Sequence, residues 1–225
     1  MPLSLPNEIK IDGTVRGTRI VSGREAMAHR TAIMDWASVC SQLGYQEIIL
    51  PSIEQESIYT DKAGEEVKGQ IWAFKDKGDR DCCLRPEGTA TCQLIARHYR
   101  SYSDIKIFYV TRCWRYERPQ EGRYREFTQF GLEILNPTRD YKKTLIDLGE
   151  KLLGLVGLQQ PTDYQMNDGA LRGLAYYTDG HGWDATAPIL GAQKQILGGG
   201  SYAEGIGFAI GLERVILARL KKEEK

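Results

Sequence analysis

The chain carries no excess charge, because its 30 lysine and arginine residues balance its 30 aspartate and glutamate residues. Domains that attract nucleic acid through bulk charge are basic, so here any such contact would need a local basic patch. No apolar run approaches the roughly 20 residues that span a bilayer. Residues 1–10 also lack the apolar core of a signal peptide. We therefore expect no membrane segment and a cytoplasmic location.

Histidine and cysteine are scarce as well. The chain has 3 histidines and 5 cysteines, with no Cys-x-x-Cys pair and no histidine at ligand spacing to a cysteine. An odd number of cysteines in a chain of this length indicates free thiols in a reducing compartment. The spacing of Gly205, Gly207 and Gly211 fits neither Gly-x-Gly-x-x-Gly nor a Gly-Lys-Ser/Thr phosphate loop. We therefore expect no protein-bound metal, Rossmann or Walker site.

What the sequence does contain is a long alternating stretch, residues 105–135, which predicts two antiparallel strands joined by a charged loop. Phe130, Leu132 and Ile134 share one face of the return strand, and this apolar face is expected to meet a helical layer. The opposite face is expected to be an open polar platform. Together with the loop, it would carry Arg115, Glu117, Arg123, Phe127, Gln129 and Glu133.

These residue types suit a nucleotide. Arginine offers a planar fork of donors and keeps its charge near neutral pH, so Arg115 and Arg123 could grip a polyphosphate. Phe127 could stack on a flat base, and Glu117 could accept a hydrogen bond from an exocyclic amine. The alternative is a hairpin whose solvated face happens to be charged. The gathering of carboxylates, an amide and an aromatic ring on one face favours the nucleotide site.

The remaining periodicity predicts an α+β fold, an antiparallel sheet flanked by helices, in a single domain of residues 1–225. In the first half of the chain we expect an extended arm at 1–19, a helix at 22–43 with a Ser22–Glu25 capping box, an exposed helix or loop at 52–68, and a hairpin at 71–84 followed by a helix from Thr89. In the second half we expect a helix at 138–158, a strand at 163–166 with a turn at 167–169, and a strand and helix at 205–220. A charged tail at 221–225 ends the chain.

Several stretches resemble one family. Residues 115–133, RYERPQEGRYREFTQFGLE, resemble motif 2 of class II aminoacyl-tRNA synthetases in its histidyl-tRNA synthetase form, and residues 205–214 resemble motif 3. Residues 84–89, LRPEGT, are similar to that family's Leu-Arg-Pro-Glu-x-Thr. Residues 172–178, RGLAYYT, resemble its Arg-Gly-Leu-Asp-Tyr-Tyr-Thr, and residues 198–203 resemble its Gly-Gly-Arg-Tyr-Asp. The resemblance runs from about Gly17 to Leu220, so it implies a class II catalytic fold.

The chain departs from the family in places. Ala175 stands where the family has aspartate, Ser201 replaces an arginine, and Ala203 replaces a second aspartate. The family's insertion domain and anticodon-binding domain have no counterpart, so we expect a catalytic core. Residues 23–54 resemble motif 1, which implies a homodimer through this region, although a helix, glycine, strand and proline are also common in plain cores.

The resemblance implies ATP-dependent activation of histidine to histidyl-adenylate and transfer to the 3′-end of tRNA, with ATP and Mg²⁺ as cofactors. Arg115 and Arg172 would hold the α-phosphate and the reacting carboxylate. The ATP site would comprise Arg115, Glu117, Arg123, Phe127 and Arg214. The amino-acid site would comprise Glu87, Thr89, Gln129, Glu133, Arg172, Tyr176, Tyr177 and Tyr202. On the residues alone, Glu87 could instead favour the start of the helix at Thr89 through its dipole.

Two other functions remain open from the sequence. One is an adenylate-forming ligase that passes histidine or a related acid to a non-tRNA acceptor. The other is a catalytically silent paralogue that binds histidine and regulates another enzyme.

Overall fold

The computed structural model describes residues 5–60, 68–170, 177–178 and 180–224. Seven strands form the main sheet, in the order β3-β7-β8-β12-β11-β10-β9, and only the β3–β7 pair is parallel. In that order the strands span Gln46–Glu47, Ile105–Trp114, Glu126–Leu135, Gly205–Gly211, Gln195–Tyr202, Trp183–Thr186 and Gln165–Asp168. The predicted α+β architecture with an antiparallel sheet and flanking helices is confirmed.

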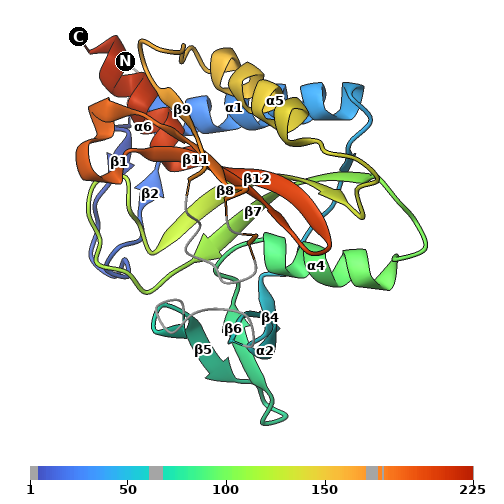
Figure 1. Ribbon diagram of the computed structural model, residues 1–225. Helices are drawn as coiled ribbons and strands as arrows, with labels where there is room; N and C mark the ends of the chain where they lie inside the picture. The colour runs from blue at the N-terminus through green and yellow to red at the C-terminus, as the bar shows by residue number, and fades with distance from the viewer. Residues whose placement is uncertain (1–4, 61–67, 171–176, 179, 225) are drawn as a thin grey trace.

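Three helices cover one face of this sheet: α1 (Gly23–Gln42), α5 (Lys142–Leu155) and α6 (Leu212–Glu223) (Figure 1). The predicted apolar residues of β8, Phe130, Leu132 and Ile134, are fully buried against them. Trp36 of α1 fixes the centre of this layer. Its ring meets Phe130 edge-on with centroids 5.2 Å apart, and its Nε1 donates to the Leu152 carbonyl at 2.7 Å.

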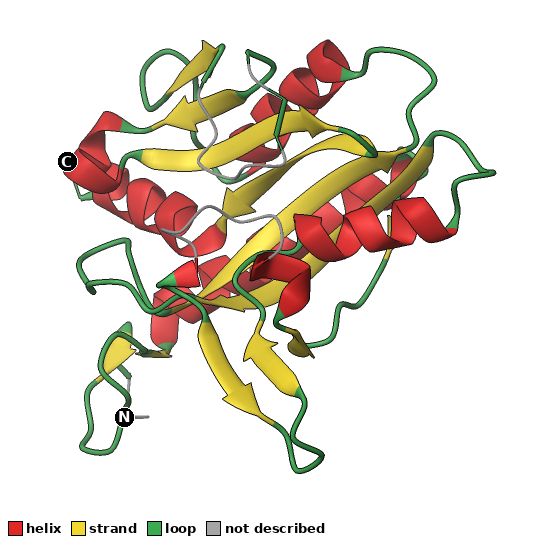
Figure 2. Cartoon of the chain, turned by 60° about the horizontal axis from the view of Figure 1, so that its bottom comes forward, coloured by secondary structure: helices red, strands yellow, loops and turns green. Residues whose placement is uncertain are grey.

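The opposite face is not the open platform expected from the hairpin alone. Helix α4 (Thr89–His98) lies across one end of it, as Figure 2 shows, with Cys92 and Ala96 packed against Tyr109 and Leu135. The reason is that this face changes character along its length. Near the Ile105 end most of its residues are apolar and pack against α4, with Glu133 buried among them, and only the other end remains accessible.

A second sheet of three strands stands below α4, in the order β4-β6-β5 (Figure 1). The predicted hairpin is confirmed as β5 (Trp72–Lys75) and β6 (Asp81–Leu84). The prediction of an exposed helix or loop at 52–68 is wrong for its first part. There β4 (Ile53–Gln55) pairs with β6, and α2 (Ser57–Thr60) follows. The sequence missed β4 because one edge strand of three residues carries too little alternation to be recognised.

The N-terminal arm is partly paired, since β1 (Glu8–Ile9) and β2 (Ile20–Val21) form a two-stranded sheet. The predicted capping box is absent at the start of α1. Ser22 Oγ donates to the Pro6 carbonyl instead, and the Glu25 carboxylate binds Arg19 at 2.7 Å. The arm folds back over the helix start and supplies partners there that a local pattern cannot anticipate.

Two further boundaries differ from the prediction. Helix α5 begins at Lys142 rather than 138, because the Asp104 carboxylate holds Thr138 through both its backbone N–H (2.9 Å) and its hydroxyl (2.6 Å). The predicted turn at 167–169 begins inside β9, where Asn167 pairs with Asp184 of β10. No helix within the described residues is long and apolar enough to cross a bilayer.

Candidate functional site

A pocket opens at the uncovered polar end of the sheet. The cavity has a volume of about 140 Å³ and opens to solvent. Its walls come from the loop between β7 and β8, the start of β8, β11, β12 and α6. Six predicted site residues line it together: Arg115, Glu117, Arg123, Phe127, Gln129 and Arg214.

The hairpin residues form one connected arrangement. The Arg115 guanidinium carbon lies 5.2 Å from the centre of the Phe127 ring, and its Nε donates to the Pro86 carbonyl at 2.9 Å. Arg123 Nε donates to the Glu117 carboxylate. The positive charges and the aromatic face therefore lie within one cavity, where they can meet an anion and a flat ring together.

The loop that carries these groups is held from outside by the N-terminal arm. Arg125 N donates to the Gly17 carbonyl at 2.7 Å, and the Arg19 guanidinium lies 3.9 Å from the Tyr124 ring centre. A Cβ at Gly17 would come within 2.8 Å of both Arg125 and Pro119, so the close approach requires glycine. This role of the arm was not predicted from the sequence.

Arg214, at the start of α6, leans into the pocket as predicted. Its three nitrogens donate to the carbonyls of Gly122 (2.7 Å) and Gln195 (3.0 Å) and to Gln193 Oε1 (3.0 Å). Burial, assisted by the neighbouring charges of Arg115 and Arg123, lowers the pKa of the Arg214 guanidinium below its usual value. A bound anion would offset this clustering of positive charge.

The neighbour of Arg214, Glu213, is a site residue that the sequence did not single out. Its carboxylate accepts the backbone N–H of Thr128 through both oxygens, at 2.8 and 2.9 Å, and ties α6 to β8.

Deeper under α4 lies a second polar group centred on Glu133. This carboxyl is 1% exposed and accepts hydrogen bonds from Thr89 Oγ1 at 2.8 Å and from the Tyr202 hydroxyl at 3.0 Å. Burial raises the pKa of Glu133 from 4.5 to about 8. Glu133 lies on the same face of β8 as Gln129, about 13 Å farther along the strand at the usual rise per residue.

Glu87 takes the helix-start position that the sequence had left as an alternative. Its carboxylate accepts the backbone N–H groups of Thr89 at 2.6 Å and Ala90 at 2.9 Å, which are unpaired donors of the first turn of α4. The Thr89 hydroxyl turns to Glu133 instead. Glu87 and Thr89 are thus linked through the backbone, and within the protein their side chains bind different partners.

Gly207 of β12 lies opposite Glu133 on the neighbouring strand. A Cβ at this position would be 1.8 Å from Glu133 Oε2 and 2.3 Å from the Leu132 carbonyl oxygen, closer than any real contact. We expect Gly207→Ala to lower the free energy of unfolding by about 3 kcal/mol, because the backbone must shift in a packed sheet. Urea denaturation measures it. Gly154→Ala in α5 is the matched control, since its Cβ meets nothing within 4 Å and should stabilise the helix slightly. Equal effects of the two changes would contradict the close-approach argument.

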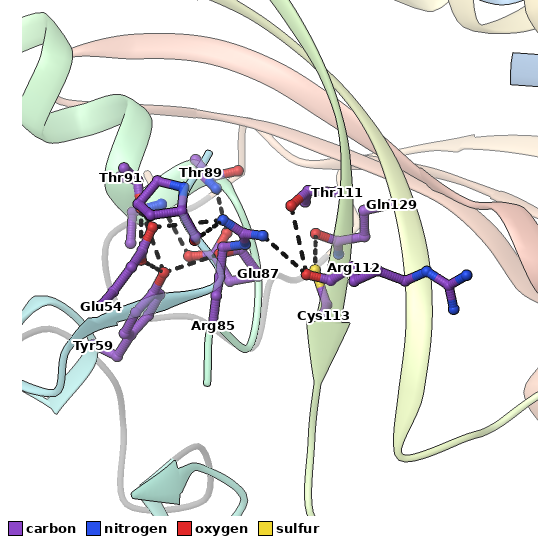
Figure 3. Close-up of polar contacts among 12 residues, drawn as sticks. Glu54, Tyr59, Arg85, Glu87, Thr89, Thr91, Thr111, Arg112, Cys113 and Gln129 are labelled. Carbon is purple, nitrogen blue, oxygen red and sulfur yellow. Dashed lines mark hydrogen bonds and ion pairs between the residues drawn. The ribbon is translucent and has the colours of Figure 1, made fainter. Parts of the chain in front are cut away.

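A third group of buried polar residues escaped the sequence analysis (Figure 3). The group consists of Arg85, Glu54 and Tyr59, which are 1%, 6% and 3% exposed. The Glu54 carboxylate pairs with the Arg85 guanidinium and accepts a hydrogen bond from the Tyr59 hydroxyl. Glu54 follows the motif 1 proline, and Arg85 belongs to the LRPEGT stretch, but neither was given a role. Sequence alone could flag them only through those motifs, because nothing local tells a buried charge from an exposed one.

The RGLAYYT stretch is only partly described. Outside the described residues lie Arg172 and Tyr176, which were predicted to bind the amino acid, and Ala175, which replaces the family's aspartate. Tyr177 is described and forms an antiparallel bridge with Tyr202, their rings edge-on with centroids 6.3 Å apart. The two tyrosines expected near a histidine side chain are therefore adjacent.

Comparison with known proteins agrees with this geometry. A family model described as Histidyl-tRNA synthetase matches residues 17–162. Histidine–tRNA ligase of Methanosarcina acetivorans is 40% identical over 147 residues, covering 64% of this chain and 36% of that protein. The enzyme of the same name from Methanosphaerula palustris is 29% identical over 307 residues, covering 90% and 74%. That alignment is longer than the present chain, so the relative contains a segment without counterpart here.

Solved structures show the same fold. Apo histidyl-tRNA synthetase from S. aureus superposes with a TM-score of 0.75 at 24% identity, covering 96% of this chain and 71% of that one. A histidine–tRNA ligase subunit from Alicyclobacillus acidocaldarius gives 0.79 at 15% identity, covering 96% and 99%. The chain spans only about a third of the Methanosarcina relative, 36% of its length. With the family model covering more than half of its residues, the chain belongs to the histidyl-tRNA synthetase family and has the class II catalytic fold.

Proposed function

We propose that this chain binds ATP and histidine across the polar end of the sheet, forms histidyl-adenylate, and passes the histidyl group to the 3′-end of tRNA. The observation that carries the proposal is the gathering of Arg115, Arg123, Arg214 and Phe127 in one pocket. Glu133 and Tyr202 lie farther along the same sheet and suit the amino-acid side chain.

The chemistry requires positioning more than proton transfer. The carboxylate of histidine is already ionised at neutral pH, so its attack on the α-phosphorus needs no general base. Arg115 would align the α-phosphate with the attacking carboxylate, together with Arg172. Arg123 and Arg214 would stabilise the charge that develops on the pyrophosphate leaving group. Phe127 would stack on adenine, with Glu117 as acceptor for its amine.

The amino acid would lie nearer α4. Gln129 lines the pocket and would fix the α-carboxylate, while Glu87 and Thr89 at the helix start would fix the α-amino group. Glu133, Tyr176, Tyr177 and Tyr202 would read the imidazole.

Mg²⁺ would be carried mainly by the triphosphate. This ion commonly binds through one or two carboxylates, phosphate oxygens and waters. Residues 5–60, 68–170, 177–178 and 180–224 contain no cluster of three or more histidine, cysteine, aspartate or glutamate side chains placed to hold a metal. Glu213 lines the pocket, and one carboxylate at that place fits an ion that arrives with ATP. When bound, the ion would neutralise phosphate charge.

We also propose a homodimer through residues 23–54. Large apolar side chains stand exposed there: Met27 is 72% exposed, Met34 62% and Ile49 92%. Exposed apolar groups of this size on one segment favour burial against a second copy. Sedimentation of the purified chain tests it, and a monomer at all concentrations would contradict it.

Pyrophosphate–ATP exchange with each of the twenty amino acids, followed by charging of total tRNA, tests the proposed function. Histidine-dependent exchange with charging of tRNA is the expected result. Exchange without charging would favour a ligase with another acceptor. Histidine binding without exchange would favour a regulatory paralogue. Exchange with several amino acids would indicate that Ala175 has relaxed the pocket.

A further inference from the structure

Arg85 is buried although it is not among the residues that line the pocket. Its side chain is 1% exposed, with Nη1 3.6 Å from Glu54 Oε1. Nη1 also donates to the Pro51 carbonyl, and Nη2 donates to the Arg112 carbonyl at 3.1 Å (Figure 3). Burying such a pair costs several kcal/mol before its attraction is counted, and apolar residues of similar volume are often at least as stable. Stability alone therefore gives no reason for arginine here.

The backbone at residues 85 and 86 is hydrogen-bonded to the segment that carries Arg115, the residue proposed to bind phosphate. Arg85 N donates to the Ser52 carbonyl at 3.1 Å, and its own carbonyl accepts Trp114 N at 2.9 Å. The next carbonyl, of Pro86, accepts Arg115 Nε at 2.9 Å. The placement of residues 85 and 86 thus determines where the Arg115 guanidinium lies.

The Glu54 carboxylate, which pairs with Arg85, is hydrogen-bonded to the start of α4, where the amino acid is proposed to bind. Glu54 accepts hydrogen bonds from the Tyr59 hydroxyl and, at 2.9 Å, from Thr91 Oγ1 of α4. The same Tyr59 hydroxyl lies 3.2 Å from the Glu87 carbonyl oxygen. The start of α4, where Glu87 and Thr89 lie, is therefore fixed to the Glu54 carboxylate from two sides.

We propose that Arg85, Glu54 and Tyr59 are positioning residues that set Arg115 and Glu87 relative to one another, and so align ATP with the amino acid. The inference rests on the proposed function for what those two residues bind. Arginine suits the task because its planar fork reaches two carbonyls and a carboxylate at once, whereas a lysine ammonium is a single point.

Arg85→Lys and Tyr59→Phe test the inference through the kinetics of histidine-dependent pyrophosphate exchange. We expect Arg85→Lys to lower kcat about 10- to 100-fold, the usual effect of removing a group that orients a functional one. Tyr59→Phe should raise KM for histidine several-fold and leave KM for ATP unchanged, because only the α4 side loses a contact. Arg80→Lys is the matched control, since this arginine lies in the turn between β5 and β6 with its side chain 78% exposed.

Amide hydrogen exchange separates positioning from loss of stability and does not depend on activity. In Arg85→Lys, residues 112–116 and 86–91 should exchange faster, whereas β11 and β12 should exchange as in the unchanged protein. A kcat within twofold of the unchanged protein, or uniformly faster exchange, would overturn the inference. If Arg85→Lys fails to fold, Tyr59→Phe tests the inference: a raised KM for histidine with an unchanged KM for ATP supports it, and equal changes in both KM values overturn it. If the unchanged chain has no pyrophosphate exchange, the proposed function fails and the hydrogen-exchange contrast alone decides the inference.

Discussion

Arg115→Ala is expected to reduce histidine-dependent pyrophosphate exchange by about 10²- to 10³-fold, to the edge of detection. Removing one preorganised donor that faces developing charge typically costs about 3 kcal/mol of transition-state stabilisation. The protein should stay folded, because the lost hydrogen bond to Pro86 contributes only about 1 kcal/mol to stability. Exchange kinetics and urea denaturation of the same preparation measure both effects.

Arg112→Ala is the matched control for this result. Arg112 lies three residues earlier on the same hairpin, its side chain is 61% exposed, and it pairs with Glu126 at 3.3 Å. Its carbonyl, which accepts from Arg85, is unaffected by the change of side chain. Near-normal exchange in Arg115→Ala, or an equal loss in Arg112→Ala, would show the phosphate assignment to be wrong.

Glu133→Gln is expected to make the protein more stable than the unchanged chain at alkaline pH. Burial raises the pKa of Glu133 from 4.5 to about 8, so between these values the folded state holds a proton that the unfolded state has released. The free energy of unfolding then falls as pH rises, by about 1.4 kcal/mol per pH unit from this group, and levels off above pH 8. Glutamine resembles the protonated acid and carries no such penalty.

Urea denaturation of both proteins from pH 5 to pH 9 measures this difference. Glu213 is also buried with a raised pKa, but it is present in both proteins, so the difference between them isolates Glu133. Tyr202→Phe gives a second check, because it should raise the pKa of Glu133 and does not remove the carboxyl group. The Tyr202 hydroxyl stabilises the ionised carboxylate and lowers the pKa of Glu133, so its loss should move the levelling-off to higher pH. If the free energies of unfolding of Glu133→Gln and the unchanged protein differed by the same amount at every pH, the raised pKa of Glu133 would be contradicted.

The hairpin illustrates what could be predicted from residues alone. A period of two places Phe127, Gln129 and Glu133 on one face regardless of what surrounds the strand, and the register of β7 with β8 bears this out. The glycine before α6 and the helix behind it likewise follow from local conformational preferences. Because Arg115, Arg123 and Arg214 stand at fixed places in these elements, their convergence in one pocket could be anticipated from the family motifs.

Burial and partner choice could not be anticipated in the same way. The chain order of residues 5–60 gives no sign that Glu54 meets Arg85, or that the N-terminal arm replaces the expected Ser22 cap. For Glu87 the sequence left open a ligand role and a role at the helix start, and only the structure shows its carboxylate accepting the first N–H groups of α4. The cost of burying a charge depends on which distant segments surround it, and only the packed chain brings those segments together.

The sequence by itself therefore determined the hairpin strands β7 and β8, the faces of that hairpin and the residue types that line the pocket, because these depend on neighbours along the chain. Tertiary structure decided that α4 closes one end of the sheet, that Glu133 is buried there beneath it, and that Arg85 links the two ends of the site. These features depend on contacts between residues far apart in sequence, which local periodicity does not encode.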